Sequence, residues 1–336
     1  MIFITGGTGI LGRVIILELL KRGKKVRAAK RPTSRLQEVK SSFKFYVENP
    51  EDYFDKIEWT DVDFDDEDSL KNALQNVEEV YHCAAKISFH PDDKKEMYKT
   101  NIGYTKNLLY ACENSSVKKF CFVSSIAVLD GLNENREMDE NSDYNPKINH
   151  SAYSVAKHFS EMEVWRASAE GLKTVIVNPG IIIGSGNWKQ GSGGVLFRNF
   201  QKNKFTFSGG VSYVDVRDVA KICVELMDKN IFGERFVLVS ESMKYEDFGN
   251  IVRKKSGQKP VKVIPDFLLK FALFLSFIFK PIFPKLKIIN KTNVESVTNF
   301  NKVSNQKIKK TLDYEFISVE GSVEFHLRNY ELDQKE

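Results

Sequence analysis

The feature that most constrains this fold is a turn with regularly spaced glycines near the start of the chain. The run FITGGTGILGRVI places Gly6, Gly9 and Gly12 directly after a short apolar run and at the start of an apolar helical pattern. Glycines at this spacing permit a tight turn and a close approach of the backbone to a pyrophosphate, and the helix N-terminus supplies free N–H groups. The run therefore predicts a dinucleotide-binding turn. A glycine-rich turn without a ligand is the alternative.

The first half of the chain alternates apolar runs with helical patterns. Strand-like runs lie at 2–5, 25–30, 57–64, 79–85, 118–125 and 173–180, and helical patterns at 10–23, 67–74, 93–115 and about 151–170. This alternation, with right-handed crossovers, gives a doubly wound parallel sheet with helices on both faces. The sequence therefore predicts an α/β fold with a Rossmann-type dinucleotide-binding domain over residues 1–180.

After residue 180 the pattern changes to glycine-rich loops, helices and isolated strands such as RFVLVS at 235–240. It predicts a smaller, discontinuous C-terminal substrate-binding lobe over 181–336, with about 211–240 returning to the first domain. Such a lobe would lie beyond the carboxyl ends of the strands, where these sheets bind ligands. Its apolar residues include the run 181–184, Trp188, Phe197 and Phe200, for which two interpretations stay open: a wall of a hydrophobic substrate pocket or a packed core.

The segment FLLKFALFLSFIF at 267–279 is apolar almost throughout. A transmembrane helix needs about 20 apolar residues, so this segment is too short to span a bilayer. Three interpretations stay open: a packed core helix, a wall of the substrate pocket, or a peripheral membrane contact aided by the lysines that follow.

Composition limits the class of protein. The chain has 336 residues, 42% hydrophobic and 28% charged, with a net charge of +5, values typical of a folded globular protein and too mild to call for nucleic acid. Its four cysteines are widely spaced and predict reduced thiols and no metal site. The N-terminus has no basic region before its first apolar run, so we expect no signal peptide and a cytoplasmic location.

The end of the second strand indicates which dinucleotide is bound. Lys30, Arg31, Ser34 and Arg35 stand where a carboxylate would hold the ribose 2′-hydroxyl of NAD. Cations and a hydroxyl suit a 2′-phosphate, which favours NADP(H) and leaves NAD(H) possible. An ordinary basic loop is the alternative. Asp63, after the third strand, is expected either to hold the adenine amino group or to cap a helix.

The run HSAYSVAKHFSE at 150–161 places Tyr153 and Lys157 on one helix face. A phenol has a pKa near 10, and a neighbouring ammonium would lower it and make the phenol a better acid. A second donor is needed for the substrate oxygen, and Ser125 at the end of the strand 118–125 is favoured. An exposed Tyr/Lys pair is the alternative. The neighbouring His150 and His158 are interpreted as ordinary helix-surface residues.

Several motifs in order resemble those of the extended short-chain dehydrogenase/reductase family, also called the NAD-dependent epimerase/dehydratase family. They are TGGTGILG (5–12), YHCAA (81–85), TNIGYTKNLL (100–109), VSS (123–125), YSVAK (153–157), NPG (178–180) and YVDVRDVA (213–220). Within the family the chain is most similar to the branch of dihydroflavonol-4-reductases and 3β-hydroxysteroid dehydrogenases. Asn178 and the absence of Tyr-Gly after the serines depart from many nucleotide-sugar enzymes.

This resemblance implies specific residue roles. Tyr153 would be the acid/base, Lys157 its partner and a ribose ligand, Ser125 the residue that orients the carbonyl, and Asn101 the support of a proton relay. The dinucleotide would be bound by the following residues: Gly6, Gly9, Ile10, Leu11, Gly12, Arg31, Arg35, Asp63, Ala84, Ala85, Lys157 and Pro179. Relatives that pair through two helices suggest a homodimer through the helices at 93–115 and 151–170.

Three functions remain as hypotheses. The first is an NAD(P)(H)-dependent oxidoreductase that exchanges hydride with a hydroxyl or keto carbon of a hydrophobic small molecule. The second is an epimerase or dehydratase of a nucleotide sugar, in which the dinucleotide stays bound. The third is a non-catalytic dinucleotide sensor, which the presence of Ser125, Tyr153 and Lys157 disfavours.

Overall fold

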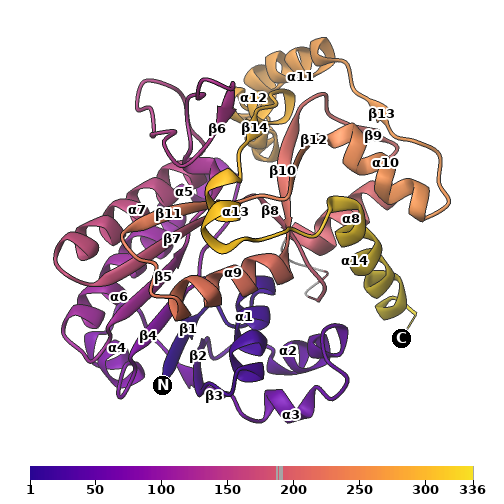
Figure 1. The fold of residues 1–336 in the computed structure, drawn as a ribbon. Coiled ribbons are helices and arrows are strands. Elements are labelled where there is room, and N and C mark those ends of the chain that lie inside the picture. Colours follow the sequence, from indigo (N-terminus) through magenta and orange to yellow (C-terminus); the bar gives the residue numbers. More distant parts are fainter. Residues whose placement is uncertain (187, 189–191, 336) are drawn as a thin grey trace.

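A parallel sheet of seven strands forms the centre of the protein (Figure 1). The computed structural model describes residues 1–186, 188 and 192–335. All pairings in the sheet are parallel, in the order β11-β7-β5-β4-β1-β2-β3. The strands are β1 (Ile2–Thr5), β2 (Val26–Lys30), β3 (Glu58–Asp61), β4 (Glu79–His82), β5 (Lys119–Val123), β7 (Lys173–Pro179) and β11 (Glu234–Leu238).

Helices cover both faces of this sheet because both faces of its strands are apolar. On one face α1 (Ile10–Lys21) packs against α9 (Val216–Asp228). The other face is covered by α4 (Glu67–Ala73), α6 (Tyr104–Glu113) and α7 (Ala152–Ala169). Strand β5 shows the alternation: Cys121 and Val123 join the core under α1 and α9, whereas Phe120 and Phe122 join the core under the other three helices. The predicted doubly wound α/β fold is therefore confirmed.

The strand order reverses between β1 and β4. From β1 the chain builds outward through β2 and β3, and from β4 it builds the other way through β5, β7 and β11. The loops that follow β1 and β4 therefore separate at their carboxyl ends and leave the crevice in which such sheets bind ligands. The glycine turn leaves β1 and the loop 83–90 leaves β4, so both border this crevice.

The predicted helix at 93–115 is interrupted. It consists of α5 (Lys94–Tyr98), a π-helical turn at Lys99–Gly103 and then α6. Such single π turns inside helices are frequent at functional sites, and this one carries Asn101. The domain is completed by α2 (Leu36–Ser42), α3 (Glu51–Phe54) and short 3₁₀ turns at Phe43–Phe45, Pro91–Asp93 and Ile126–Val128.

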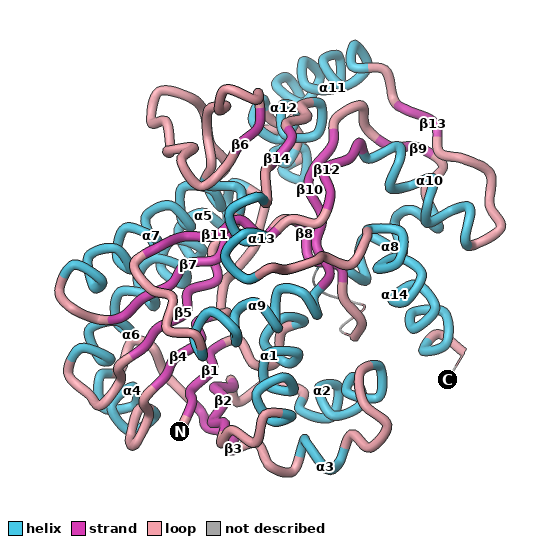
Figure 2. Tube along the Cα trace, viewed as in Figure 1, coloured by secondary structure: helices cyan, strands magenta, loops and turns pink. Residues whose placement is uncertain are grey.

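The second lobe lies beyond the carboxyl ends of the main strands and is built on short strands (Figure 2). Its strands are β8 (Ile181–Ile183), β10 (Gly210–Asp215) and β12 (Glu241–Lys244) in one sheet, with the pairs β6 (Glu137–Met138) with β14 (Lys302–Val303) and β9 (Phe205–Thr206) with β13 (Lys262–Val263). Its helices are α8 (Ser192–Lys202), α10 (Tyr245–Lys255), α11 (Asp266–Phe279), α12 (Lys291–Thr298), α13 (Gln306–Leu312) and α14 (Val319–Asp333), with a 3₁₀ turn at Pro284–Ile288.

Three aromatic residues, for which both a pocket wall and a packed core were open, lie in the core of this lobe. Trp188, Phe197 and Phe200 are buried together with Tyr213 and Phe248, and the rings of Tyr213 and Phe248 stack at 4.3 Å. The segment 211–240 is divided between the two parts of the protein. Strand β10 belongs to the sheet of the second lobe, whereas α9 packs against α1 and β11 pairs with β7 in the main domain. The two parts of the chain are thus joined through β10 and α9, which are consecutive.

The apolar segment 267–279 forms α11, and it is not a core helix. Ser276 is its one buried residue, and the helix packs against α12 and the 3₁₀ turn at Pro284–Ile288. The phenylalanines on its outer face are exposed in the part of the chain that the structure describes. Among the described residues, no helix combines the length and hydropathy needed to cross a membrane.

Candidate active site

The glycine turn is packed so closely that side chains could not replace its hydrogens. Gly6 has a φ of +69°, and a Cβ added there would lie 2.7 Å from the backbone N of Ala84. A Cβ on Gly12 would lie 2.2 Å from the carbonyl oxygen of Gly6. The first hydrogen bond of α1 runs from Arg13 N to Gly9 O at 3.2 Å. In the described part of the chain, the amides of the first turn, those of Ile10, Leu11 and Gly12, therefore have no backbone acceptor and can bind an anion.

The side chain of Arg13 stabilises the glycine turn by hydrogen bonds to its carbonyl groups. This role of Arg13 was not assigned from the sequence. Its guanidinium is buried and donates from Nε to Gly9 O at 3.2 Å and from Nη2 to Thr8 O at 2.5 Å. Burial lowers its pKa to about 10. Its Nη1 has no hydrogen-bond partner among the described residues. An arginine inside an otherwise apolar helix start was the signal available in the sequence.

A chain of buried hydrogen bonds connects β1 to the π turn. Thr5 Oγ1 lies 2.6 Å from His82 Nδ1 and accepts from the amide of Ala84 at 3.2 Å. His82 Nε2 lies 2.9 Å from Thr105 Oγ1, which in turn donates to the carbonyl of Asn101 at 2.6 Å. Burial lowers the pKa of His82 to about 3, so its ring is neutral. This series of hydrogen bonds fixes the backbone of Ala84 against the glycine turn. The adjacent Ala85 is exposed.

The predicted 2′-phosphate ligands at the end of β2 differ in availability. Lys30 forms an ion pair with Asp61 of β3 at 2.7 Å, and Arg35 forms one with Glu38 at 3.0 Å. Arg31 is exposed, and its guanidinium has no partner among the described residues. Asp63 is also exposed, and its carboxylate accepts from the amide of Asp65 at 2.9 Å within the turn before α4.

Ser125 and Tyr153 meet at the carboxyl end of β5. The Ser125 hydroxyl accepts from the amide of Ala127 at 3.2 Å. Burial raises the pKa of Tyr153, and the interaction of its phenol with the Ser125 hydroxyl acts in the opposite direction. Ser151 caps α7 by accepting from the amide of Ser154, which fixes the turn that carries the phenol. The structure thus brings a hydroxyl and a phenol together at the crevice.

Lys157 lies one turn further along α7 and is buried. Its ammonium donates to the carbonyl of Val123 at 2.7 Å and lies 4.3 Å from the ring centroid of Phe122. Burial lowers the pKa of Lys157 to about 8, against the opposing charge of Glu161. The groups that shift the pKa of Tyr153 do not include Lys157. The expected lowering of the phenol pKa by the ammonium is therefore wrong for this structure, because the ammonium is directed at the strand end.

Asn101 lies in the π turn and holds the loop after β4. Its Oδ1 accepts from the amide of Lys86 at 2.7 Å, and its Nδ2 donates to the carbonyl of Lys86 at 2.9 Å. Its own carbonyl accepts from Ser160 of α7 at 2.9 Å. The side chain of Asn101 therefore fixes the loop after β4 and does not bond to the backbone of its own helix. Its support of a proton relay stays a prediction.

Two further residues position Ser125 and were not assigned from the sequence. Asn178 Nδ2 donates to the carbonyl of Ser125 at 3.1 Å and to Glu161 Oε1 at 2.6 Å. Glu161 is buried, and burial raises its pKa. Asn178 precedes Pro179, the buried last residue of β7. The position of Glu161 four residues after Lys157 was the signal that could have identified it.

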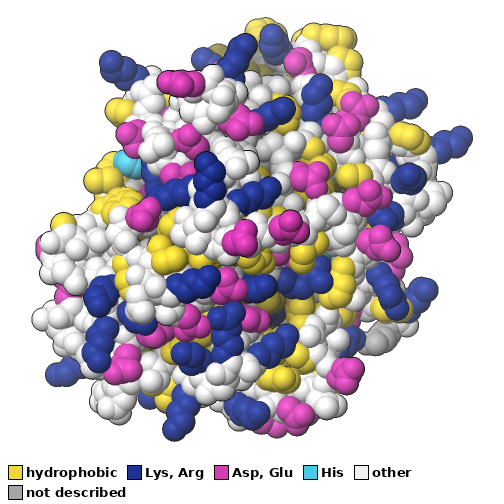
Figure 3. Space-filling model, viewed as in Figure 1, with side chains coloured by type: hydrophobic (Ala, Val, Ile, Leu, Met, Phe, Trp, Pro, Cys, Tyr) yellow, Lys and Arg dark blue, Asp and Glu magenta, His cyan; other side chains and the backbone are white. Residues whose placement is uncertain are grey.

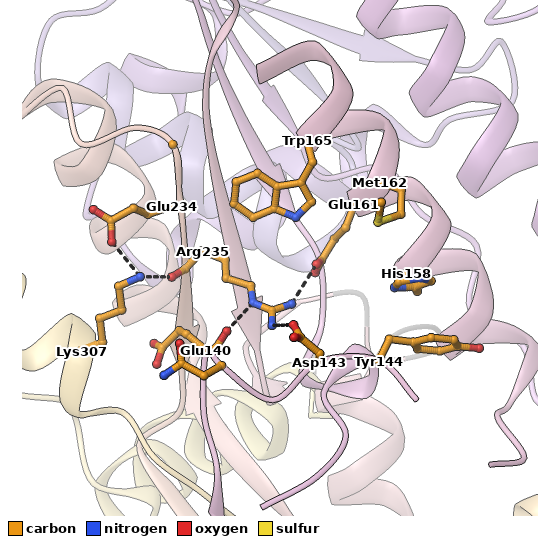
Figure 4. Close-up of a pocket in the computed structure, with 12 residues that line it drawn as sticks. Glu140, Asp143, Tyr144, His158, Glu161, Met162, Trp165, Glu234, Arg235 and Lys307 are labelled. Carbon is orange, nitrogen blue, oxygen red and sulfur yellow. Dashed lines mark hydrogen bonds and ion pairs between the residues drawn. The ribbon is translucent and has the colours of Figure 1, made fainter. Parts of the chain in front are cut away.

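A cavity of about 520 Å³ is lined by Glu161 together with residues of β11 and of the loop before α7 (Figure 4). Figure 4 shows Arg235 between Glu161 and Asp143, with Arg235 Nη1 3.6 Å from Glu161 Oε2. At its rim the ring of Tyr144 stacks between His150 and His158, with centroids 4.1 and 3.9 Å away. The interpretation of both histidines as ordinary surface residues is therefore wrong, because they hold the loop before α7.

The described residues include no group of three His, Cys, Asp or Glu side chains that could hold a metal ion. The four cysteines are free thiols, of which three are buried. The groups brought together at the crevice are therefore open amides, a hydroxyl, a phenol and an ammonium. These fit the anionic dinucleotide and the carbonyl or carbinol substrate that the sequence predicted.

Curated relatives align over most of the chain. Sterol demethylase protein B of Methylococcus capsulatus is 28% identical over 286 residues, which cover 84% of this chain and 83% of that protein. Sterol-4-alpha-carboxylate 3-dehydrogenase, decarboxylating, of Dictyostelium discoideum is 28% identical over 93% of this chain and 95% of that protein. A putative dihydroflavonol 4-reductase of Synechocystis is 28% identical over 65% of this chain and 60% of that protein.

Solved structures share the fold. The crystal structure of gox2253 superimposes with a TM-score of 0.84 at 24% identity, covering 99% of this chain and 98% of that one. UDP-glucose 4-epimerase of Thermotoga maritima gives a TM-score of 0.76 at 21% identity, with 99% of both chains covered. At these identities the likeness shows the architecture alone.

The family itself is decided by the sequence. The model of the NAD dependent epimerase/dehydratase family matches residues 2–238, from β1 through β11. The match spans the glycine turn and the Ser125, Tyr153 and Lys157 cluster, and it confirms the resemblance drawn from the motifs. The chain belongs to the NAD dependent epimerase/dehydratase family and is an NAD(P)-dependent oxidoreductase of the extended short-chain dehydrogenase/reductase type.

Proposed function

We propose that the protein is an NADP(H)-dependent reductase or dehydrogenase that interconverts a ketone and an alcohol on a hydrophobic small molecule. The observation that carries this proposal is that the Ser125 hydroxyl at the end of β5 interacts with the Tyr153 phenol and favours its ionised form. These two groups form a paired donor for one substrate oxygen, which a carbonyl or carbinol provides.

The chain's own residues supply the proton and the binding groups. When bound, the dinucleotide provides or accepts the hydride. In reduction, Tyr153 gives its phenolic proton to the carbonyl oxygen while Ser125 holds that oxygen in place. The open amides of α1 receive the pyrophosphate, and Lys157 ties α7 to the end of β5 through the carbonyl of Val123. Asn178 keeps Ser125 in position by binding its carbonyl.

Arg31 supports the preference for NADP(H). It is the cation at the end of β2 that has no partner among the described residues, whereas Lys30 and Arg35 are each paired with a carboxylate. An exposed guanidinium with free donors binds a phosphate through two parallel hydrogen bonds. The 2′-phosphate of NADP is a group of this kind.

A hydrophobic substrate is supported by the loop after β4 and by the relatives. Ile87 and Phe89 are 62% and 57% exposed on this loop, which Asn101 fixes beside the crevice. Two of the relatives described above bear names that state a sterol substrate. The apolar loop provides a surface that such a compound could contact.

We also infer a homodimer formed through α6 and α7. Tyr110, Phe159 and Met162 on these helices are 43%, 49% and 50% exposed. Sedimentation equilibrium of the wild type and of Phe159→Glu with Met162→Glu tests it, with dissociation of the variant expected and an unchanged mass arguing against it. A cytoplasmic location stays a prediction from the free cysteines.

The reaction is tested in two stages. Purified protein is denatured, and any released dinucleotide is identified by mass. Loss of NADPH absorbance is then followed with aryl, steroid and isoprenoid ketones, using the wild type, Tyr153→Phe and the matched control Tyr144→Phe. We expect Tyr153→Phe to lose at least ~100-fold in turnover, as the loss of a general acid implies, while binding NADPH like the wild type. Tyr144→Phe keeps its stacked ring and should keep activity.

Tightly bound NAD together with epimerisation of a UDP-sugar, and no ketone turnover, would establish the nucleotide-sugar alternative instead. Full activity in Tyr153→Phe would remove the phenol from the mechanism. NADPH binding without turnover of any ketone or sugar nucleotide would favour the sensor.

A further inference from the structure

Helix α11 presents a row of phenylalanines to solvent. Phe267, Phe271, Phe274 and Phe277 are 57–70% exposed, and the spacing of the first three places them on one face of the helix. The apolar surface continues past the helix through Ile282, which is 69% exposed, and Phe283 and Ile288. Figure 3 shows hydrophobic side chains at the upper end of the molecule, where Figure 1 places α11. A continuous apolar surface of this kind on a folded chain marks an interaction site.

The shape of this surface is fixed by polar contacts on its inner side. Ser276, the buried residue of α11, donates to the carbonyl of Leu273 and to that of Ile289, each at 2.8 Å. The second bond folds the segment after the helix back against it. These contacts therefore hold the exposed apolar side chains of the helix and of the following segment on one surface.

Positive charge surrounds the apolar residues. Residues 267–291 include Lys270, Lys280, Lys285, Lys287 and Lys291 and contain no acidic residue. Lys270, Lys280 and Lys285 form no ion pair with a described residue, whereas Lys287 pairs with Asp92 at 3.0 Å. An apolar helix face bordered by lysines matches the interface of an anionic bilayer, where acyl chains lie beside phosphate and carboxylate head groups.

We propose that α11 and the turn after it, residues 266–289, are a docking surface for anionic phospholipid membranes. The helix has 14 residues, or ~21 Å at 1.5 Å per residue, and would lie in the interface without crossing the bilayer. A second copy of the chain fits less well. A two-fold contact through the same surface would bring together Lys270, Lys280 and Lys285 of both copies, which form no ion pair with a described residue.

The docking surface is connected to the crevice through α12. Asn293 Nδ2 donates to the carbonyl of Phe89 at 3.1 Å, and Lys287 pairs with Asp92. The loop 83–93 thus joins the docking surface at one end and Asn101 at the other. Docking would therefore place the exposed Ile87 and Phe89 near the membrane. The proposal needs no assumption about the reaction, and vesicle binding tests it without an activity assay.

The test is flotation of the purified full-length protein with vesicles. Vesicles of phosphatidylcholine with roughly a third phosphatidylserine are compared with vesicles of phosphatidylcholine alone. We expect the wild type to float with the anionic vesicles, and at least tenfold less of it with the neutral ones. Because exposed charges are screened by salt, binding should weaken at high ionic strength.

Variants assign the binding to the surface. Phe271→Glu with Phe274→Glu should reduce binding to anionic vesicles at least tenfold, and both side chains are exposed enough for folding to be retained. The matched control is Leu332→Glu, an equally radical change at a half-exposed residue of α14. Lys270→Gln with Lys280→Gln and Lys285→Gln should remove the preference for anionic vesicles. Circular dichroism and dinucleotide binding, which do not depend on this surface, show whether each variant is folded.

Three results would overturn the proposal. The first is a wild type that floats with neither kind of vesicle. The second is equal binding after the two phenylalanine changes. The third is light scattering in which a wild-type dimer becomes a monomer in the phenylalanine variant, which would assign the surface to a second copy of the chain.

Discussion

The ammonium of Lys157 donates to the carbonyl of Val123 across 2.7 Å, which ties α7 to the last residue of β5. Two residues later, the Ser125 hydroxyl favours the ionised form of the Tyr153 phenol. Lys157 thereby fixes the distance between the end of β5, which is followed by Ser125, and helix α7, which carries Tyr153. In this structure it positions the site and does not act directly on the pKa of the phenol.

The buried ammonium gives stability a defined pH dependence. Burial lowers the Lys157 pKa from 10.5 to about 8, so the folded state binds fewer protons than the unfolded state between these values. The free energy of unfolding therefore gains a component that rises with pH from about 8 to 10.5, of order 3 kcal/mol in total. Lys157→Met removes this component.

Urea unfolding of the wild type and Lys157→Met across this window measures the difference. The exposed Lys106→Met on α6 is the control and should follow the wild type. A constant difference between wild type and Lys157→Met at all pH values would show that the lysine does not titrate in this window.

Gly12→Ala should disrupt the dinucleotide turn. The added methyl would lie 2.2 Å from the Gly6 carbonyl oxygen, and neither backbone segment can move without distorting the turn. We expect a lower Tm and a loss of NADPH binding of at least tenfold by fluorescence titration. At Gly103 an added Cβ meets nothing within 4 Å, so Gly103→Ala should leave binding unchanged and, in a helix, raise stability slightly. Tight binding by Gly12→Ala would contradict this packing argument.

Asn101→Ala should release the loop after β4. The substitution removes both hydrogen bonds to Lys86, each worth about 1 kcal/mol, from a loop beside the crevice. Hydrogen–deuterium exchange should become faster over residues 84–93, and kcat should fall. The control is Asn107→Ala on α6, which loses a bond to Phe64 and should affect exchange there. Unchanged exchange over 84–93 with a large loss of kcat would favour the proton-relay role for Asn101.

Arg31→Ser should separate the two dinucleotides. Loss of a free guanidinium from the 2′-phosphate site should weaken NADPH binding about 10- to 100-fold, as expected for charge-assisted hydrogen bonds of about 1.5–3 kcal/mol, and leave NADH binding nearly unchanged. Arg35→Ser should have a smaller effect, because Arg35 already pairs with Glu38. Calorimetric titration with both dinucleotides measures this. Equal losses for NADPH and NADH would place Arg31 away from the 2′-phosphate.

The sequence predicted the parts of this protein that depend on neighbours along the chain. The glycine turn between β1 and α1, the alternation of strands and helices, and the Tyr153 and Lys157 pair on α7 are local patterns with periods of a few residues. They were sufficient for the fold class and for the family, both of which are confirmed.

The tertiary structure decided what depends on residues far apart. Asn178 joins Ser125 to Glu161, and Asn101 holds Lys86, through contacts that no local pattern encodes. It also decided the place of the apolar residues. Phe197 is buried because α10, α14 and the lobe sheet enclose it, whereas Phe271 lies on a side of α11 that stays exposed among the described residues. Sequence determines how apolar a helix is, but burial depends on whether the fold brings a second surface against it.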